Sequence, residues 1–373
     1  MRRKFYFLEP SKVATQHIYL LGGYLRALAN SQTIARDFDL IVCASKSTLS
    51  NLPASLISRL HCVRVFVMNP EKRRLTIKTL VEFSVVLWRM WRLRQGDVLF
   101  VSCVLPTTFV LIEFANRVLK RSGIYVALHG EIEGLYPTSR QSILSNGYWA
   151  AAWLRLRAPD SLISLVVLDD FIKDRLVHSF PEKLRQTNVF VVHHPVFPLH
   201  TQAILRAPPT VGFLGYRTRA KSFESFAALA AEVPSMDFVA IGGGKVEDLR
   251  SGAVQLLASK DAYLDEIARC TVACFPYTAS YTCCLSASAL DALAAGVQIL
   301  AMDRPFFSEL ASYFGPDVVV TVANASQLAE ALPRFGAGSG EQGRLLRLRK
   351  VAASKFGVDA VQRSFEALPD VCR

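Results

Sequence analysis

The sequence lacks the features of a zinc ribbon, a secreted protein or a membrane-spanning protein. Its eight cysteines include no Cys-x-x-Cys pair, so a zinc ribbon is not indicated. The longest apolar-leaning stretch, residues 75–93, is interrupted by four charged residues, each costly at the centre of a bilayer. The apolar run before Glu9 has four residues, too few for the core of a signal peptide. We therefore expect reduced thiols, no transmembrane span and a cytoplasmic protein.

Acidic residues are scarce relative to basic ones, 31 against 43, which gives a formal net charge of +12. Such a chain attracts anions: phosphorylated ligands, acidic lipid surfaces or nucleic acid. No helix-turn-helix, zinc-finger or RNA-recognition motif is visible and the positive charge is scattered, so we expect no nucleic-acid partner. Charged residues make up 20% of the chain and hydrophobic ones 51%, which indicates a folded protein with a sizeable core.

Short apolar runs alternate with helix-like segments along the 373 residues. The alternation is typical of parallel strands joined by crossover helices, and it predicts an α/β fold. No repeat with a period of about 20–50 residues is visible, so a solenoid or propeller is not expected. The expected strands are residues 4–8, 38–44, 63–66, 97–102, 123–127, 164–168 and 188–192 in the first half, and 210–214, 237–241, 254–257, 272–275, 297–301 and 318–321 in the second.

A proline-rich stretch, HHPVFPLHTQAILRAPPT, separates the two series of strands. Proline blocks a continuous helix or a central strand, so this stretch is the expected linker, centred near residue 203. At roughly 150 residues per domain, the chain divides into an N-terminal domain, 1–202, and a C-terminal domain, 203–343. Residues 344–373 form a helical segment that could pack back on the N-terminal domain.

The segment TVGFLGYRTRAK, residues 210–221, joins a buried-type strand to a cationic loop. Gly215 ends the strand, and Arg217 and Lys221 follow it. Ligands of open α/β sheets bind beyond the carboxyl ends of the strands, where these two cations could hold a diphosphate. The alternative is that they are solvated loop charges.

Two later segments carry further candidates. In VAIGGGK, Gly243 follows a strand and would allow close backbone approach to a ligand, although the spacing fits neither a dinucleotide fingerprint nor a Walker loop.

In FPYTASYTCCLSASALDALAAGVQILA, a strand ends near Tyr277, and Ser286 or Ser288 opens a helix that stops at Gly296. Exposed amides and hydroxyls at a helix N-terminus can bind an anion, and the alternative for these serines is ordinary capping.

Taken in order, these segments resemble the nucleotide-binding domain of GT-B glycosyltransferases over residues 208–335. The shared features include a segment like LLASKDAYLDEIARCTVACFPY and a helix like ALDALAAGVQILA. The resemblance implies two Rossmann-like domains whose parallel sheets face each other across a cleft, with a UDP- or GDP-linked sugar as donor substrate and no further cofactor. It also implies that Arg217 and Lys221 contact the diphosphate, Ser286 and Ser288 the phosphates, Ala258 and Ser259 the nucleobase, and Asp291 the ribose or the sugar hydroxyls.

The chain departs from part of this family pattern. Many retaining members have two glutamates eight residues apart in this segment, whereas this sequence has Cys283 and Asp291. Retaining stereochemistry is therefore not supported, and an inverting transfer is the expectation. Serines before the helix and an aspartate within it look more like transferases that build bacterial exopolysaccharide, capsule or lipopolysaccharide chains.

In the first half, ALHGEIEG places His129 and Glu131 directly after a strand. An inverting transfer needs a base that accepts the proton of the acceptor hydroxyl, and histidine or a carboxylate suits that task. These two residues are the catalytic candidates, with a histidine hydrogen-bonded inside a loop as the alternative. His17, behind the first strand, could touch the donor phosphate or the acceptor, and a structural role is the alternative there as well.

Residues 72–94 place seven lysines and arginines around Trp88 and Trp91. This is the composition of a helix that lies on an anionic membrane, and the alternative is a core helix with basic flanks. A helix that lies on the membrane surface would suit a lipid-linked or oligosaccharide acceptor and a peripheral position on the inner face of the cytoplasmic membrane.

Other functions are compatible with the same architecture. A nucleotide-sugar epimerase needs several acids and histidines in its cleft, and the sequence offers few. A catalytically inactive transferase that acts as a binding subunit stays open, because the glutamate pair is missing. His193 and His194 have no metal-binding partner in register and no other ligand cluster is clear, so no metal is expected.

Overall fold

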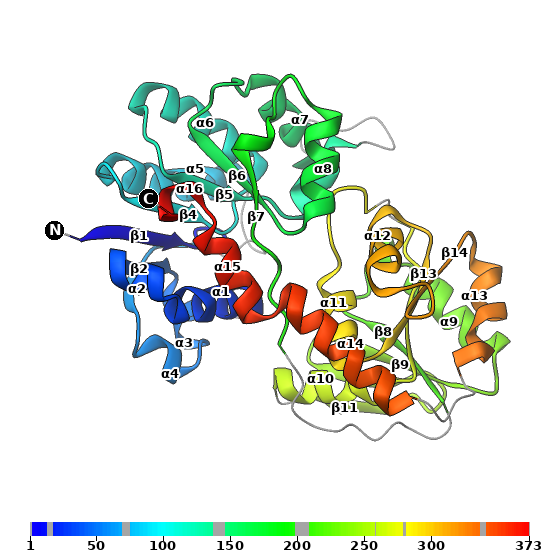
Figure 1. Ribbon diagram of the computed structural model, residues 1–373. Helices are drawn as coiled ribbons and strands as arrows, with labels where there is room; N and C mark the ends of the chain where they lie inside the picture. Colours follow the sequence, from blue (N-terminus) through cyan, green and yellow to red (C-terminus); the bar gives the residue numbers. More distant parts are fainter. Residues whose placement is uncertain are drawn as a thin grey trace. The chain divides into compact units, whose positions relative to one another are not determined.

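The computed structural model describes residues 2–12, 18–68, 75–136, 146–197, 209–257, 259–278, 281–335 and 341–372. Two compact units form, and each has its own sheet (Figure 1). The first unit comprises Met1–Pro195, Cys283–Leu285 and Val358–Arg373, and the second comprises Val196–Thr282 and Ser286–Gly357. The linker centre expected near residue 203 lies outside the described residues.

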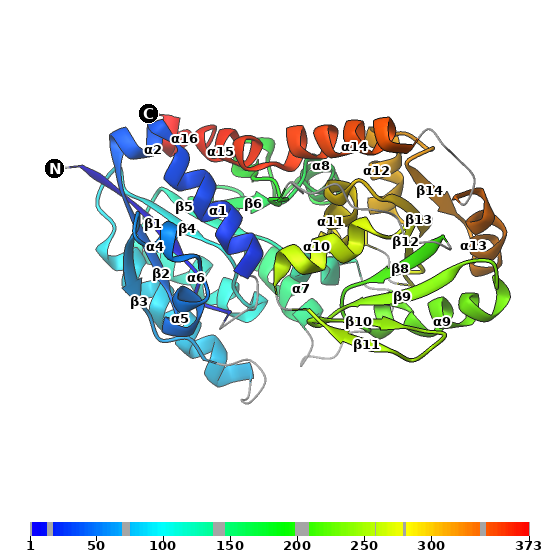
Figure 2. The same cartoon turned by 90° about the horizontal axis from the view of Figure 1, so that it is seen from below.

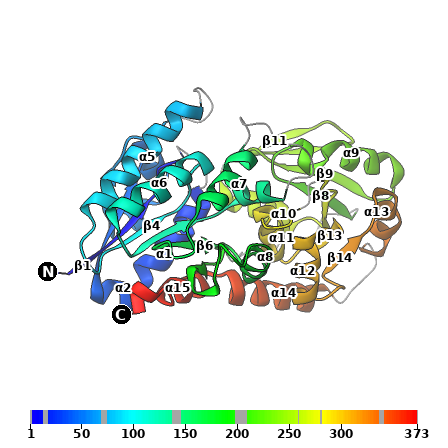
Figure 3. The ribbon, with the colours of Figure 1, turned by 90° about the horizontal axis from the view of Figure 1, so that it is seen from above.

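The sheet of the first unit has seven strands, all parallel, in the order β3-β2-β1-β4-β5-β6-β7. Its strands are near-continuous apolar runs because helices cover both faces of a parallel sheet. Figure 3 shows α5, α6 and α7 on one face and α1 with α15 on the other. The strands are β1 (Arg3–Leu8), β2 (Phe38–Ala44), β3 (His61–Arg64), β4 (Val98–Val101), β5 (Ile124–Ala127), β6 (Ile163–Val167) and β7 (Val189–Val191).

The last two helices of the chain belong to this first unit, and one of them contributes to its aromatic core. Phe365 lies with its ring centroid 5.1 Å from that of Phe100 on β4 and 5.3 Å from that of Tyr24 on α1. Figure 2 shows α15 running alongside α1. The helices of the unit are α1 (Ile18–Asn30), α2 (Gln32–Asp37), α3 (Lys46–Ser50), α4 (Ala54–Ile57), α5 (Leu75–Arg92), α6 (Pro106–Leu119), α7 (Asn146–Leu156), α8 (Asp170–Ser179), α15 (Val358–Glu366) and α16 (Pro369–Cys372), with 3₁₀ turns η2 (Gly130–Leu135) and η3 (Gln186–Asn188).

The sheet of the second unit also has seven strands, in the order β11-β10-β9-β8-β12-β13-β14. Five are parallel, whereas β10 and β11 form an antiparallel extension at one edge. Phe213, Phe226 and Phe238 pack at the centre of one face, with centroids 5.4 Å apart in successive pairs. The strands are β8 (Thr210–Leu214), β9 (Asp237–Gly242), β10 (Lys245–Asp248), β11 (Val254–Leu256), β12 (Val272–Phe275), β13 (Gln298–Met302) and β14 (Val319–Val322).

Helices cover both faces of this sheet as well (Figure 2). Among them, α11 begins after its cap Ser286 and ends at Gly296, whose φ is +82°, as the sequence predicted. The helices are α9 (Phe223–Glu232), α10 (Lys260–Ala268), α11 (Ala287–Ala295), α12 (Pro305–Phe314), α13 (Ala325–Ala331) and α14 (Glu341–Phe356), with 3₁₀ turns η4 (Arg219–Lys221) and η5 (Leu332–Phe335).

The expectation of parallel strands throughout is wrong at one place. Gly242 pairs with Lys245 across a two-residue turn in which Gly243 and Gly244 have φ of +61° and +77°, the conformation that a tight hairpin requires. The chain therefore reverses into β10, which the sequence did not predict, instead of entering a crossover helix. The third strand was also placed two residues late, because Phe66, counted as part of an apolar run, is 70% exposed.

Candidate functional site

Three candidate groups of the second unit converge where β8 ends. Gly215 has a φ of +96°, and a Cβ built on it would lie 2.6 Å from Lys221 Nζ and 2.8 Å from Ser288 Oγ. A side chain at Gly215 would therefore collide with both groups, and the positive φ also favours glycine. An ammonium and a hydroxyl thus face a bare stretch of backbone at the C-terminal edge of the sheet, where α/β folds bind ligands.

The electrostatics of Lys221 suit an anion. Its Nζ donates to the Leu214 carbonyl at 3.4 Å and lies 5.4 Å from the centre of the Tyr277 ring. Burial lowers the pKa of Lys221 to about 8, and the carboxylate of Asp291 opposes this shift. Because desolvation disfavours the ammonium, an anion that contacted Nζ would stabilise the charged form.

The first turn of α11 supplies the hydroxyl of Ser288, and Ser286 has a different role. Ser286 Oγ accepts from the Ala289 amide at 3.4 Å and shares a hydrogen bond of 3.1 Å with Tyr277 Oη. Tyr277 is fully buried, and burial raises its pKa. Ser286 and Tyr277 therefore fix the start of α11, while Ser288 lies two residues further on, beside Lys221.

Three other candidates of this unit, Arg217, Ser259 and Gly243, have structural contacts of their own. Arg217 pairs with Glu247 of β10, 2.5 Å between Nη2 and Oε2, and covers the Phe223 ring at 4.0 Å. Ser259 caps α10 by accepting from the Ala262 amide at 3.1 Å, and Gly243 belongs to the hairpin turn. Of the proposed nucleobase loop, Ala258 lies outside the described residues.

In the first unit, His129 follows β5 and precedes η2. Its Nε2 lies 2.6 Å from the carbonyl oxygen of Ser102. A carbonyl oxygen only accepts, so Nε2 carries the hydrogen and a neutral ring has its lone pair on Nδ1. The backbone of Glu131 belongs to η2, but its side chain and all of His17 lie outside the described part of the chain.

Glu9, which with Glu133 is the next carboxylate to consider as a base, is linked to His129 through Ser102. It follows β1, is 2% exposed, and its Oε2 lies 2.7 Å from Ser102 Oγ. Its Oε1 accepts from the amides of Ser11 and Lys12, each at 3.0 Å. Glu9, Ser102 and His129 follow β1, β4 and β5, which are neighbours in the sheet, so the strand order would have brought them together.

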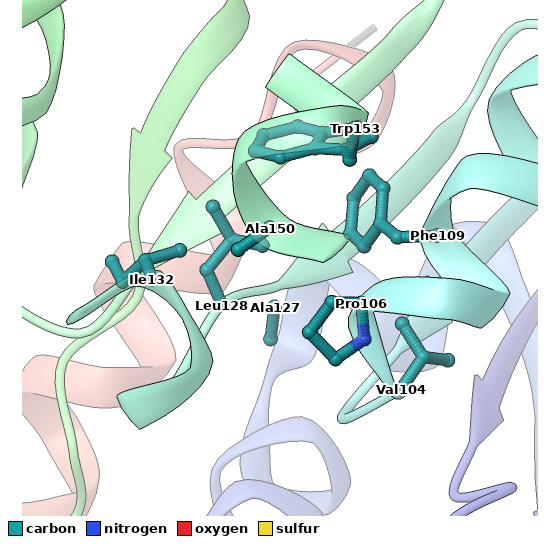
Figure 4. A pocket seen from close by; sticks show the side chains of 8 residues that line it. All are labelled: Val104, Pro106, Phe109, Ala127, Leu128, Ile132, Ala150 and Trp153. Atoms are coloured by element: carbon teal, nitrogen blue, oxygen red, sulfur yellow. The ribbon is translucent and has the colours of Figure 1, made fainter. Parts of the chain in front are cut away.

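A small apolar cavity lies next to His129 in the same unit (Figure 4). Leu128 and Ile132, on either side of His129 in the sequence, contribute to its wall. Its volume is about 20 Å³, room for roughly one water molecule. The indole of Trp153 also lines it, and Trp153 Nε1 is buried with no hydrogen-bond partner among the described residues. The lining is Val104, Pro106, Phe109, Ala127, Leu128, Ile132, Ala150 and Trp153.

No cluster of three or more His, Cys, Asp or Glu side chains that could hold a metal occurs among the described residues. The sequence has one Asp-x-Asp triplet, formed by Asp37 and Asp39. Asp37 pairs with Arg36 at 2.8 Å and Asp39 with Arg2 at 3.6 Å. Both carboxylates lie at the N-terminal end of β2, the edge opposite the one that carries Glu9 and His129.

Solved structures resemble this chain over its whole length, while no protein-family model and no curated protein sequence matches it. WaaG, a glycosyltransferase involved in lipopolysaccharide biosynthesis, is 11% identical with a TM-score of 0.66, covering 98% of this chain and 99% of its own. HepE of Anabaena, solved with UDP-glucose, is 12% identical with a TM-score of 0.63, covering 97% and 98%. Sucrose-phosphate synthase of Thermosynechococcus elongatus is 15% identical with a TM-score of 0.68, covering 98% and 97%.

These structures define a class of fold. The chain is an α/β protein with the GT-B fold, two Rossmann-like units each built on a mainly parallel seven-stranded sheet, and the predicted fold class is confirmed. Among the structures that share it are WaaG and HepE, which place this chain beside glycosyltransferases in architecture.

Proposed function

We propose that this protein is a glycosyltransferase that moves a sugar from a nucleoside-diphosphate sugar to a hydroxyl of a saccharide or lipid-linked acceptor in surface polysaccharide synthesis. The observation that carries the proposal is the convergence of Lys221 and Ser288 on Gly215 at the C-terminal edge of β8. The fold supports it, because HepE, which shares the fold, was solved with UDP-glucose and with UDP.

On the side of the donor substrate, the diphosphate would lie against Gly215. Lys221 Nζ and Ser288 Oγ would donate hydrogen bonds to it, and the first-turn amides of α11 would add the favourable field of a helix N-terminus. These groups neutralise the charge that grows on the leaving diphosphate, which is the stabilisation that transfer requires. No metal has a part in this scheme.

On the acceptor side, His129 would act as the base of an inverting displacement, with Glu131 as the second candidate. The acceptor oxygen forms a bond to the anomeric carbon while the bond from that carbon to the diphosphate oxygen breaks. The hydroxyl proton moves to the histidine, whose neutral ring has its lone pair on Nδ1 because Nε2 donates to Ser102.

The α5 helix supports a membrane-bound acceptor. Its apolar side chains Ile77, Leu80, Trp88 and Trp91 recur at helical spacing on one side, and all four are exposed. The two tryptophans are 47% and 59% exposed, and Arg92 covers the Trp88 ring at 3.9 Å. An exposed apolar stripe with arginines beside it fits the interface of an anionic bilayer.

The opposite side of α5 is buried and mixed in character: polar side chains are buried in its first half, and Val86 and Met90 in its second half. Lys78 and Glu82 are buried there, 3.5 Å apart, and Glu82 accepts from Thr108 Oγ1 at 2.8 Å. The neighbouring helix α6 (Figure 3) has two exposed apolar side chains of its own, Phe114 and Val118, which are 68% and 76% exposed. The exposed apolar side chains support our proposal of peripheral binding on the inner face of the cytoplasmic membrane. No described helix is long and apolar enough to cross a bilayer.

The test is nucleotide binding by the full chain. Binding is monitored through the melting temperature in the presence of UDP, GDP, ADP or CMP, because a ligand that binds only the folded state raises the melting temperature. We expect UDP or GDP to stabilise the wild type, and Lys221→Ala and Ser288→Ala to weaken that effect. Arg219→Ala removes an exposed cation from the same loop and is the matched control. Equal stabilisation in all four proteins would contradict the proposed site.

A further inference from the structure

We infer that Gly242 is a positioning residue of the proposed donor site. Because it has no side chain, β9 lies close enough to Gly215 to hold that backbone beside Lys221 and Ser288. Gly242 is the last residue of β9 and the first of the glycine triplet 242–244. Its effect on nucleotide binding rests on the proposed function, whereas its effect on the backbone of Gly215 does not depend on a ligand.

The three glycines of the triplet are needed for different reasons. Gly243 and Gly244 form the turn between β9 and β10, with φ of +61° and +77°, a conformation that favours glycine. A Cβ built on Gly243 would lie 3.9 Å from the Tyr216 ring, which is an ordinary contact. The φ of Gly242 lies outside the left-handed region, so the backbone conformation does not require a glycine there.

The space that a side chain of Gly242 would need is filled by the backbone of Gly215. A Cβ built on Gly242 would lie 2.2 Å from the Gly215 carbonyl oxygen, 2.6 Å from the carbonyl carbon and 2.9 Å from the Cα atom. Ordinary contact begins at 3.4 Å, so a methyl group needs a separation about 1.2 Å larger than the present 2.2 Å. Backbone cannot rotate away as the end of a flexible side chain does, so the two strands would have to part at this point.

Gly215 takes its place in the sheet from β9. Its amide donates to the Ile241 carbonyl at 2.8 Å, whereas β8 pairs with its other neighbour, β12, only at Val211 and Gly212. Separating Gly215 from β9 by about 1.2 Å would lengthen the 2.8 Å hydrogen bond beyond the usual range. The same movement would shift this backbone relative to the ammonium and the hydroxyl that face it.

The diphosphate is the part of the donor that depends on this placement. Lys221 Nζ and Ser288 Oγ lie 2.6 Å and 2.8 Å from a Cβ built on Gly215, so a diphosphate that bonds both groups lies against the bare backbone. A misplacement of about 1 Å can cost a site roughly 10²-fold. A nucleoside without phosphates does not use these contacts, and its binding should not depend on Gly242.

The test compares Gly242→Ala with two matched variants. Gly243→Asn adds a larger side chain to the next residue of the same hairpin, where Asn-Gly is a favoured turn sequence. Gly212→Ala adds a methyl group to β8 at 2.9 Å from the Cys270 sulfur, and it controls for a general loss of stability. We expect Gly242→Ala to weaken UDP or GDP binding by roughly 10²-fold, with uridine or guanosine binding unchanged, and both control variants to bind like the wild type.

NMR of isotope-labelled glycine gives a readout that needs no nucleotide. The amide signal of Gly215 should shift in Gly242→Ala and stay in place in Gly243→Asn. An unshifted Gly215 signal, or equal losses of nucleoside and nucleoside-diphosphate binding, would overturn the role of Gly242. A Gly242→Ala protein that folds at no temperature tested would overturn it too, because the fold rather than the site would then require the glycine. A shifted signal, in a protein whose wild type binds no nucleoside diphosphate, would contradict the proposed function alone.

Discussion

The sharpest prediction concerns the pH dependence of nucleotide binding through Lys221. Burial holds the pKa of this ammonium at about 8 in the free protein, while a bound diphosphate requires the charged form. Below pH 7 the ammonium is present and binding needs no proton uptake. Above pH 8 each binding event must take up a proton, so the dissociation constant should rise about tenfold between pH 7 and pH 9.

Replacing Lys221 separates this effect from others. Lys221→Ala should weaken binding by about 10- to 100-fold at pH 7, since a charge-assisted hydrogen bond contributes roughly 1.5–3 kcal/mol, and it should flatten the pH dependence. Lys221→Arg should flatten it too, because arginine stays charged. Isothermal titration calorimetry from pH 6.5 to 9.5 gives the affinity of each variant at pH 7 and its change with pH, with Arg219→Ala as control. A dissociation constant that still rose with pH in Lys221→Ala would refute the role of this lysine.

Three further predictions concern the metal requirement, the α5 surface and the catalytic base. Turnover should survive excess chelator, because Lys221 and helix amides neutralise the leaving group; activity that needs added manganese would contradict this. Replacing Trp88 and Trp91 together with alanine should reduce sedimentation with anionic vesicles by roughly tenfold or more, and salt should release the wild type; binding that survives both changes would exclude the α5 surface. His129→Ala should cut turnover at saturating donor sugar by about 10²–10⁴-fold with normal nucleotide affinity, whereas a comparable loss only in Glu131→Gln would make Glu131 the base.

The sequence was sufficient where local chemistry decides the structure. Residues 38–44, 210–214 and 272–275 form strands with the predicted bounds, because buried parallel strands are continuous apolar runs. The helix from Ser286 to Gly296 was predictable from its cap and its terminating glycine. The hairpin at Gly243 was missed because glycines after a strand suit both a tight turn and a ligand-binding loop.

The site was less predictable because its contacts depend on strand order. Arg217 finds its partner Glu247 on β10, the strand that was missed, so its pairing could not be foreseen. Lys221 and Ser288 are 67 positions apart in the sequence and meet because β8 and β12 are neighbours. Glu9 and His129 are likewise joined only by the adjacency of β1, β4 and β5, which hydrophobic periodicity does not encode.

Sugar transfer is tested most directly by the release of nucleoside diphosphate from a panel of UDP- and GDP-linked sugars, because this release reports cleavage of the bond to the anomeric carbon. The panel is run with and without a phospholipid extract as acceptor source, on wild type, Lys221→Ala, Ser288→Ala and Arg219→Ala. We expect release by wild type and Arg219→Ala from at least one sugar nucleotide, with both site variants slowed by at least about tenfold. Wild-type release no faster than that of Lys221→Ala across the whole panel would contradict it.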